Sequence, residues 1–140
     1  MKDYLILRVI SKLLIPVIML FGLYTQMHGD YGPGGGFQAG VIFASAFVLY
    51  TLVFDPETAM RVLGWRTLLL LVPIGVLIFA LTGVASLILG GNFLEYGVFG
   101  HGEHGLAHGN HIGILAIEFG VGITVASVVV TIFYAFAQRR

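Results

Sequence analysis

Four long apolar segments separate the charged parts of this chain. They run approximately over residues 5–26, 37–54, 67–89 and 112–136. A membrane-spanning helix needs about 20 mostly apolar residues, and each segment is close to that length. The third segment carries no charge, and the fourth carries one, Glu118. The sequence therefore predicts an all-α membrane protein, with four transmembrane helices in one integral membrane domain over residues 1–140.

The composition supports a lipid environment. Hydrophobic residues make up 58% of the 140 residues and charged residues only 10%, whereas soluble domains average roughly half and a quarter. The formal net charge of zero argues against a basic nucleic-acid-binding face. The absence of cysteine excludes disulfides and thiolate metal sites. No Ala-x-Ala-like cleavage site follows the first segment before His28, so we expect this segment to stay in the protein.

The basic residues fall on one side of the membrane if four spans alternate. All seven lie before or early in the first segment, between the second and third, or at the C-terminus: Lys2, Arg8, Lys12, Arg61, Arg66, Arg139 and Arg140. Lys and Arg remain cytoplasmic in multi-pass proteins. The pattern predicts cytoplasmic N- and C-termini.

The stretch "HGDYGPGGGFQAG", residues 28–40, contains six glycines between the first two segments. A phosphate loop would need Lys and Ser/Thr after Gly40, where Val41 and Ile42 stand, and the glycine spacing misses the dinucleotide fingerprint by one residue. We reject both nucleotide interpretations. Three others remain: a tight turn with close helix packing through Gly36, Gly40 and Ala44, a contact with a polar group of a partner subunit, or a bound anion at the exposed start of the helix.

The glycine-rich stretch and the apolar segments on either side of it resemble a known protein family. The segment "LLIPVIMLFGLYTQMHGDYGPGGGFQAGVIFASAFVLY" resembles the MnhB family, which supplies a small membrane subunit of the multisubunit monovalent cation/proton antiporters of the Mrp or Mnh type. The matching signature residues are His28, Gly29, Pro33, Gly34, Gly35, Gly36, Phe37 and Gly40. Gly32 departs from the serine that the family often has before the proline. The resemblance extends over the whole chain, to "IGILAIEFGVGITVASVVVTIFYAF" in its second half.

The resemblance implies a small integral-membrane subunit of a hetero-oligomeric antiporter that exchanges Na+ for H+. Its partners would be large subunits resembling respiratory proton pumps, together with other small membrane subunits. Its role would lie in assembly and in the ion path, without a cofactor. A purely structural subunit and a stand-alone homo-oligomeric transporter or sensor remain open. We do not expect an enzyme, because no nucleophile–base arrangement, paired carboxylates within a span or cofactor motif is found.

Several ionisable residues are candidates for function. Glu118 lies six residues into the predicted fourth span, about 9 Å deep at 1.5 Å per residue; an acid there indicates an ion or proton site, or a structural helix–helix pair. Lys12 fits contact with anionic lipid head groups or a pair with an acid of a partner subunit. His28 and Asp30 would receive external protons or cations, or fix the turn.

The stretch "HGEHGLAHGNH" holds four histidines at steps of three, four and three: His101, His104, His108 and His111. On a helix this spacing would place all four on one face, as in a metal site. Glycines within the stretch weaken any helix, and the H-E-x-x-H pattern is absent. We therefore favour a solvated loop or a contact with a neighbouring subunit over a metal site, and an external pH sensor remains open.

Overall fold

The computed structural model describes residues 5–29, 34–100 and 105–138. Its four long helices are α1 (Leu5–Met27), α2 (Gly36–Phe54), α4 (Trp65–Ile88) and α5 (Gly105–Ala137). Each is long and apolar enough to cross a membrane, as the sequence predicted. A short helix, α3 (Pro56–Val62), links α2 to α4, and a single 3₁₀ turn, η1 (Tyr96–Phe99), precedes α5.

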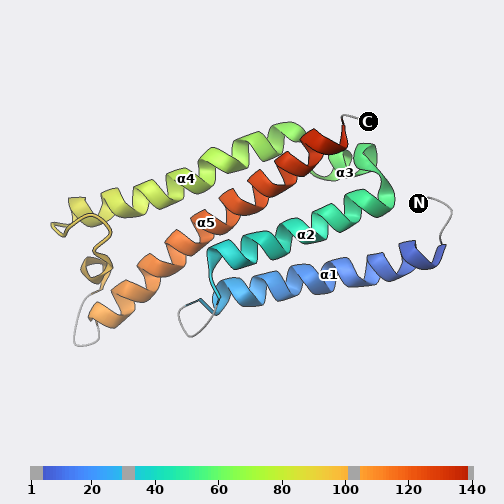
Figure 1. The fold of residues 1–140 in the computed structure, drawn as a ribbon. Coiled ribbons are helices and arrows are strands. Elements are labelled where there is room, and N and C mark those ends of the chain that lie inside the picture. The colour runs from blue at the N-terminus through green and yellow to red at the C-terminus, as the bar shows by residue number, and fades with distance from the viewer. Residues whose placement is uncertain (1–4, 30–33, 101–104, 139–140) are drawn as a thin grey trace.

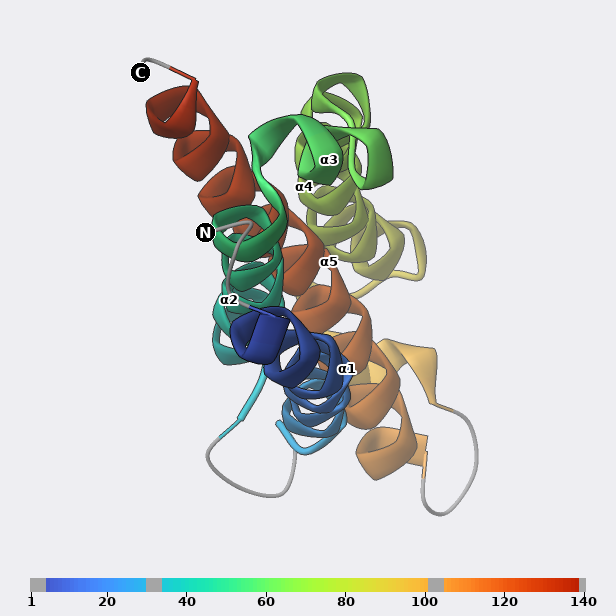
Figure 2. The same ribbon diagram turned by 90° about the vertical axis from the view of Figure 1, so that its right-hand side faces the viewer.

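The long helices form a layer rather than a closed four-helix bundle. The order across the layer is α1, α2, α5 and α4, and α1 and α4 lie at its two edges (Figures 1 and 2). Helix α5 packs on both α2 and α4, whereas α1 packs mainly on α2. Both ends of the chain lie at the end of the layer that also carries α3 (Figure 1).

Glycines bring the helix backbones close together on both sides of α5. A methyl group on Gly40 of α2 would come within 2.8 Å of the Gly122 carbonyl oxygen of α5. On the other side, a methyl group on Gly120 would lie 2.7 Å from the Gly75 carbonyl oxygen of α4. Lipid is as apolar as leucine, so helices in a bilayer associate through such close packing rather than through hydrophobicity.

The core lies toward the end of the layer that carries α3. It consists of Ala44, Ala59, Leu68, Val130 and Tyr134, each at most 1% exposed. Helix α2 ends at Phe54, and α3 begins at Pro56. Proline is common at the first position of a helix, because its missing N–H would have no partner there. Helix α3 buries Ala59 in this core and closes that end of the layer.

The sequence-based prediction of a glycine-weakened loop before the fourth span is wrong for residues 105–111. These residues belong to α5, which begins at Gly105. The glycines form the face that η1 covers: a methyl group on Gly109 would lie 2.6 Å from the Tyr96 carbonyl oxygen, and one on Gly113 would collide with the Tyr96 ring. Tertiary packing against η1 therefore outweighs the low helix propensity of glycine.

Candidate functional site: an intramembrane acid at a glycine turn

The turn between α1 and α2 is tied to the end of α1 by one carbonyl oxygen. Thr25 O accepts hydrogen bonds from His28 N (3.3 Å) and from Gly35 N (3.2 Å). Gly35 has a φ of 111°, in the region that favours glycine, and α2 begins at the next residue. This geometry explains why glycine is required just before α2.

Glu118 of α5 lies against this turn. Methyl groups on Gly29 and Gly36 would collide with its carboxylate and its backbone, respectively, and one on Gly35 would come within 2.8 Å of Oε1. The contact joins the first inter-helix turn to the last helix, far apart in the chain. Glu118 fits against the turn because these three glycines have no side chain.

The start of α2 presents positive partial charge to Glu118. The first N–H groups of a helix have no partner within that helix, and its N-terminus is the positive end of the helix dipole. The carboxylate lies beside Gly35 and Gly36, where α2 starts. The structure places an acid of the same chain at this turn, and the interpretation that a polar group of a partner subunit also contacts it stays a prediction.

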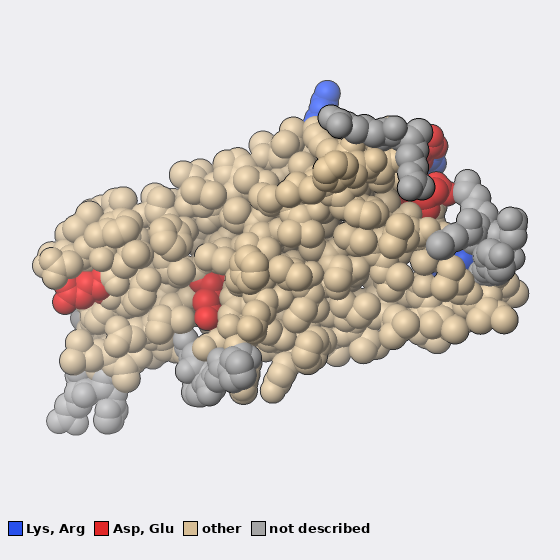
Figure 3. Space-filling model, in the orientation of Figure 1, with Lys and Arg blue, Asp and Glu red and all other residues tan. Residues whose placement is uncertain are grey.

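Glu118 is the one acid in the described part of the four long helices. It is half-buried. Figure 3 shows an acidic patch between the two ends of the molecule, separate from the charged residues at those ends. Because its carboxylate contacts the turn between α1 and α2, Glu118 lies level with the ends of these two helices, where a half-buried carboxylate can accept a proton or a cation and can be reached from the surface. A role of Glu118 in ion transfer stays a prediction.

The other signature residues of the turn are distributed around this contact. The ring of His28 stacks on Tyr24, with 5.3 Å between ring centroids. Phe37, in the first turn of α2, is 66% exposed, so its ring can face lipid or a partner. Asp30 and Pro33 lie outside the described residues.

Lys12 and Glu118 lie near opposite ends of α2. Its Nζ is 5.9 Å from the centroid of the Phe54 ring, and the Arg8 guanidinium carbon is 5.3 Å from the same centroid. A cation over an aromatic face is attracted by the ring quadrupole. These two basic residues of α1 therefore flank the last residue of α2, and they are not brought to the glycine turn.

The histidine stretch is described only in part. His108 and His111 are exposed in the first turns of α5, whereas His101 and His104 lie outside the described residues. Among the residues that the structure describes, no group of three or more metal-binding side chains occurs.

Sequence reasoning missed Gln26, which lies next to the site. Gln26 is 6% exposed, and a methyl group on Gly122, one turn along α5 from Glu118, would come within 2.6 Å of its Oε1. Its Nε2 has no hydrogen-bond partner within the described residues. The signal available in the sequence was its position, a polar amide inside an apolar segment and four residues after Gly22.

Comparison with known proteins decides the family. Residues 6–131 match the family described as "Domain related to MnhB subunit of Na+/H+ antiporter". The chain belongs to the MnhB family. A relative from Staphylococcus haemolyticus (strain JCSC1435), named "Putative antiporter subunit mnhB2", is 33% identical over 140 residues, covering 99% of this chain and 98% of the relative. A protein of the same name from Staphylococcus aureus (strain MRSA252) is 31% identical over 139 residues, with the same coverage.

Membership of the MnhB family agrees with the resemblance seen in the sequence. The matched region contains both the glycine turn and Glu118. Together with the four long apolar helices, it identifies this MnhB chain as a multi-pass membrane protein.

Proposed function

We propose that the chain is a small integral-membrane subunit of a hetero-oligomeric Na+/H+ antiporter in the prokaryotic plasma membrane. Its partners are large proton-pump-like subunits and other small membrane subunits, and the complex exchanges Na+ for H+. Support comes from MnhB family membership and from near full-length relatives named as antiporter subunits. We further propose that the chain is needed for assembly, with both termini in the cytoplasm.

The observation that carries a role in ion passage is the position of Glu118. It is an acid within a membrane-spanning helix, half-buried and seated against the glycine turn. Acids at such positions are rare because they are costly in lipid, and they mark ion or proton routes. One acid cannot form a path across about 30 Å of hydrocarbon, so other subunits complete the route.

A purely structural role is the second candidate. The same contact favours it, because a carboxylate beside the start of α2 also fixes α5 against the turn. The two candidates differ in what glutamine would do at this position. Glutamine retains hydrogen-bonding capacity but carries no charge and does not exchange a proton, so it tests ion passage while retaining much of the structural contact.

Complex membership is tested by copurification. A tagged copy of this chain is isolated from mild-detergent extracts of its native membrane, and we expect it to bring the large antiporter subunits with it. Isolation of a lone homo-oligomer that transports Na+ after reconstitution would contradict the proposal and support a stand-alone transporter.

The ion-path role is tested in inside-out vesicles by Na+-dependent proton movement. We expect Glu118→Gln to assemble but to lose most transport, at least about tenfold, because removal of a positioned proton-transfer group typically lowers the rate 10²–10⁴-fold. Glu57→Gln serves as the matched control, since Glu57 is exposed in α3 and should transport normally. If Glu118→Gln and Glu118→Ala both assemble and transport at the wild-type rate, Glu118 is not in the ion path.

A further inference from the structure

Two basic side chains of α1 meet at one aromatic ring of α2. The Arg8 guanidinium carbon lies 5.3 Å from the centroid of the Phe54 ring, and Lys12 Nζ lies 5.9 Å from the same centroid. Phe54 is buried, whereas Arg8 and Lys12 are both exposed. The ring therefore gathers two cations at the surface, and their N–H donors are left for another group.

The two charges have no counter-ion in the described part of the chain. There, Arg8 and Lys12 make neither an ion pair nor a hydrogen bond, and their contacts with the Phe54 ring are cation–π contacts. Asp55, the acid next to Phe54, accepts a hydrogen bond from Thr58 Oγ1 (3.5 Å). Like charges four residues apart on a helix repel each other. An anion that contacts both cations would remove this repulsion.

The position of the pair along α1 matches the depth of lipid head groups. Helix α1 begins at Leu5, so Arg8 lies about 4.5 Å and Lys12 about 10 Å from its start, at 1.5 Å per residue. The helix has 23 residues and is about 34 Å long, slightly more than a hydrocarbon core of about 30 Å. Arg8 therefore lies near the edge of the core. Lys12, one turn deeper, can extend its side chain to the same level.

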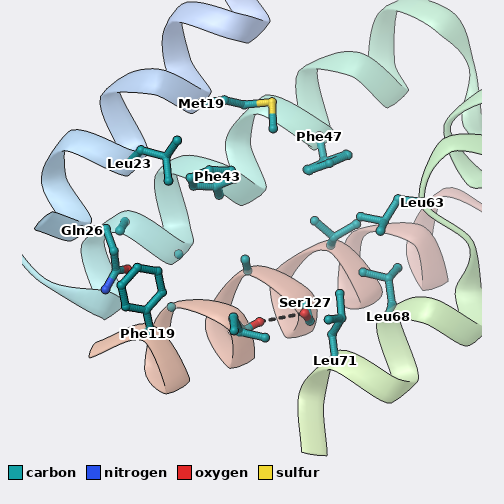
Figure 4. A pocket seen from close by; sticks show the side chains of 16 residues that line it. Met19, Leu23, Gln26, Phe43, Phe47, Leu63, Leu68, Leu71, Phe119 and Ser127 are labelled. Carbon is teal, nitrogen blue, oxygen red and sulfur yellow. Dashed lines mark hydrogen bonds between the residues drawn. The ribbon is translucent and has the colours of Figure 1, made fainter. Parts of the chain in front are cut away.

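Charge on this face of α1 is confined to its first turns. Met19 and Leu23 lie further along the same face, and both point into the apolar groove among the long helices (Figure 4). Helix α1 lies at an edge of the layer (Figures 1 and 2). Beside the basic pair, its outer side carries apolar residues that are at least 50% exposed: Leu5, Val9 and Leu13. The pair thus adjoins an apolar surface, as the phosphate of a lipid adjoins its acyl chains.

We propose that Arg8 and Lys12 bind the phosphate of an anionic phospholipid in the leaflet at the α3 end of the layer. The guanidinium donates to two phosphate oxygens and the ammonium to one, and the acyl chains run along the exposed apolar side of α1. Charge complementarity favours this occupant, because the membrane supplies anions at this depth and they attract basic residues near its surface. The proposal requires α1 to span the membrane, and it is independent of the ion path proposed for Glu118.

Photo-crosslinking of the assembled complex tests the site. The complex is reconstituted in phosphatidylcholine vesicles with a small fraction of a probe lipid that carries a diazirine in one acyl chain near the ester. The probe is either phosphatidylglycerol, which is anionic, or phosphatidylcholine, which has no net charge, and labelled residues are mapped by peptide mass spectrometry.

We expect the phosphatidylglycerol probe to label Leu5, Val9 and Leu13 about 25-fold more than the phosphatidylcholine probe does, at about fivefold for each cation. Leu20 provides the comparison within the same helix, because it is an exposed residue of α1 nearer the glycine turn. The two probes should label Leu20 equally.

Substitutions separate charge from shape. Arg8→Gln combined with Lys12→Gln should lower phosphatidylglycerol labelling to the level of phosphatidylcholine, whereas Arg8→Lys combined with Lys12→Arg should retain most of the preference. Arg66→Gln is the matched control and should leave labelling unchanged. Arg66 is an exposed basic residue in the first turn of α4, at the other edge of the layer (Figures 1 and 2). If the double glutamine variant does not assemble, each single variant gives the same comparison, at about a fivefold loss.

Three results would overturn the proposal. The first is equal labelling of the residues beside the pair by the two probes in the wild-type complex. The second is a preference for phosphatidylglycerol that persists in an assembled complex after both cations are removed. The third is a carbodiimide crosslink between Lys12 and a carboxylate, which would show that an acid of another subunit or of this chain is the counter-ion. Copurification and transport by Glu118→Gln are measured separately, so failure of the lipid site is distinguishable from failure of the proposed function.

Discussion

Gly36 shows how little space separates α2 from α5. A methyl group there would collide with the backbone of Glu118, which cannot move aside as a side-chain tip would. We therefore expect Gly36→Ala to destabilise the protein by about 1–3 kcal/mol, the usual range for overpacking. The measurement is the midpoint of thermal unfolding in detergent, together with the amount of protein in the membrane.

Gly64→Ala is the control for this substitution. Gly64 precedes α4 with a φ of −70°, and an added methyl group would be 3.5 Å from the nearest atom, the Met60 carbonyl oxygen. Alanine fits there without a collision, so only its poorer N-cap preference remains, and stability should fall by about 0.5 kcal/mol, less than for Gly36→Ala. Equal unfolding midpoints for Gly36→Ala and the wild type would show that α2 and α5 are not held in the close contact described.

The individual site residues could be predicted from the sequence, but their contact could not. Glu118 stands out as the one acid in an apolar segment, and the glycines stand out by their density. Their juxtaposition depends on α5 packing between α2 and α4, and nothing local in the sequence specifies that order. The burial of Gln26 was not predicted, because an amide near the end of a span is expected to face the membrane interface. In the structure this side chain is buried against Gly122.

At the scale of elements, hydropathy identified the long helices because lipid imposes a minimum apolar length on each of them. It carries no information on short elements, so α3 and η1 were not predicted. The start of α5 was placed too late because helix propensity was weighed without the packing of η1. Among the described residues, glycines such as Gly40, Gly83 and Gly120 mark close contacts between elements rather than turns.

The loop after α4 offers a test of this role of glycine. The ring of Phe93 lies over Gly83 of α4, where a methyl group would collide with it. The Ser86 hydroxyl holds the same loop, accepting from Leu94 N (3.0 Å) and donating to the Asn92 carbonyl oxygen (2.9 Å). Substitutions at Gly83 and Phe93 should therefore be coupled.

We expect Gly83→Ala to lower the unfolding midpoint when Phe93 is present. In a Phe93→Ala background the collision is gone, and alanine should then stabilise α4 by up to about 1 kcal/mol over glycine. A double-mutant cycle on thermal unfolding measures this change of sign. Additive effects would mean that Phe93 does not pack on Gly83.

At the scale of the whole molecule, charge is concentrated at the end that carries both termini. Arg8 and Lys12 begin α1, and Arg61 and Arg66 lie in α3 and at the start of α4. An even number of spans returns the chain to the side on which it started, which agrees with the positive-inside prediction that both termini lie on the same side of the membrane. The end with α3 should be cytoplasmic, and the glycine turn should face outward.

The chain contains no cysteine, so single introduced thiols can report this orientation directly. We expect Leu106→Cys, at a position 74% exposed near the start of α5, to react with a membrane-impermeant maleimide in intact cells. Glu57→Cys, at an exposed position of α3, should react only in inside-out vesicles or after permeabilisation. The reverse pattern would place Glu118 nearer the cytoplasm, and any ion it accepts would then enter from that side. Labelling of both thiols in intact cells would mean that the four helices do not all cross the membrane.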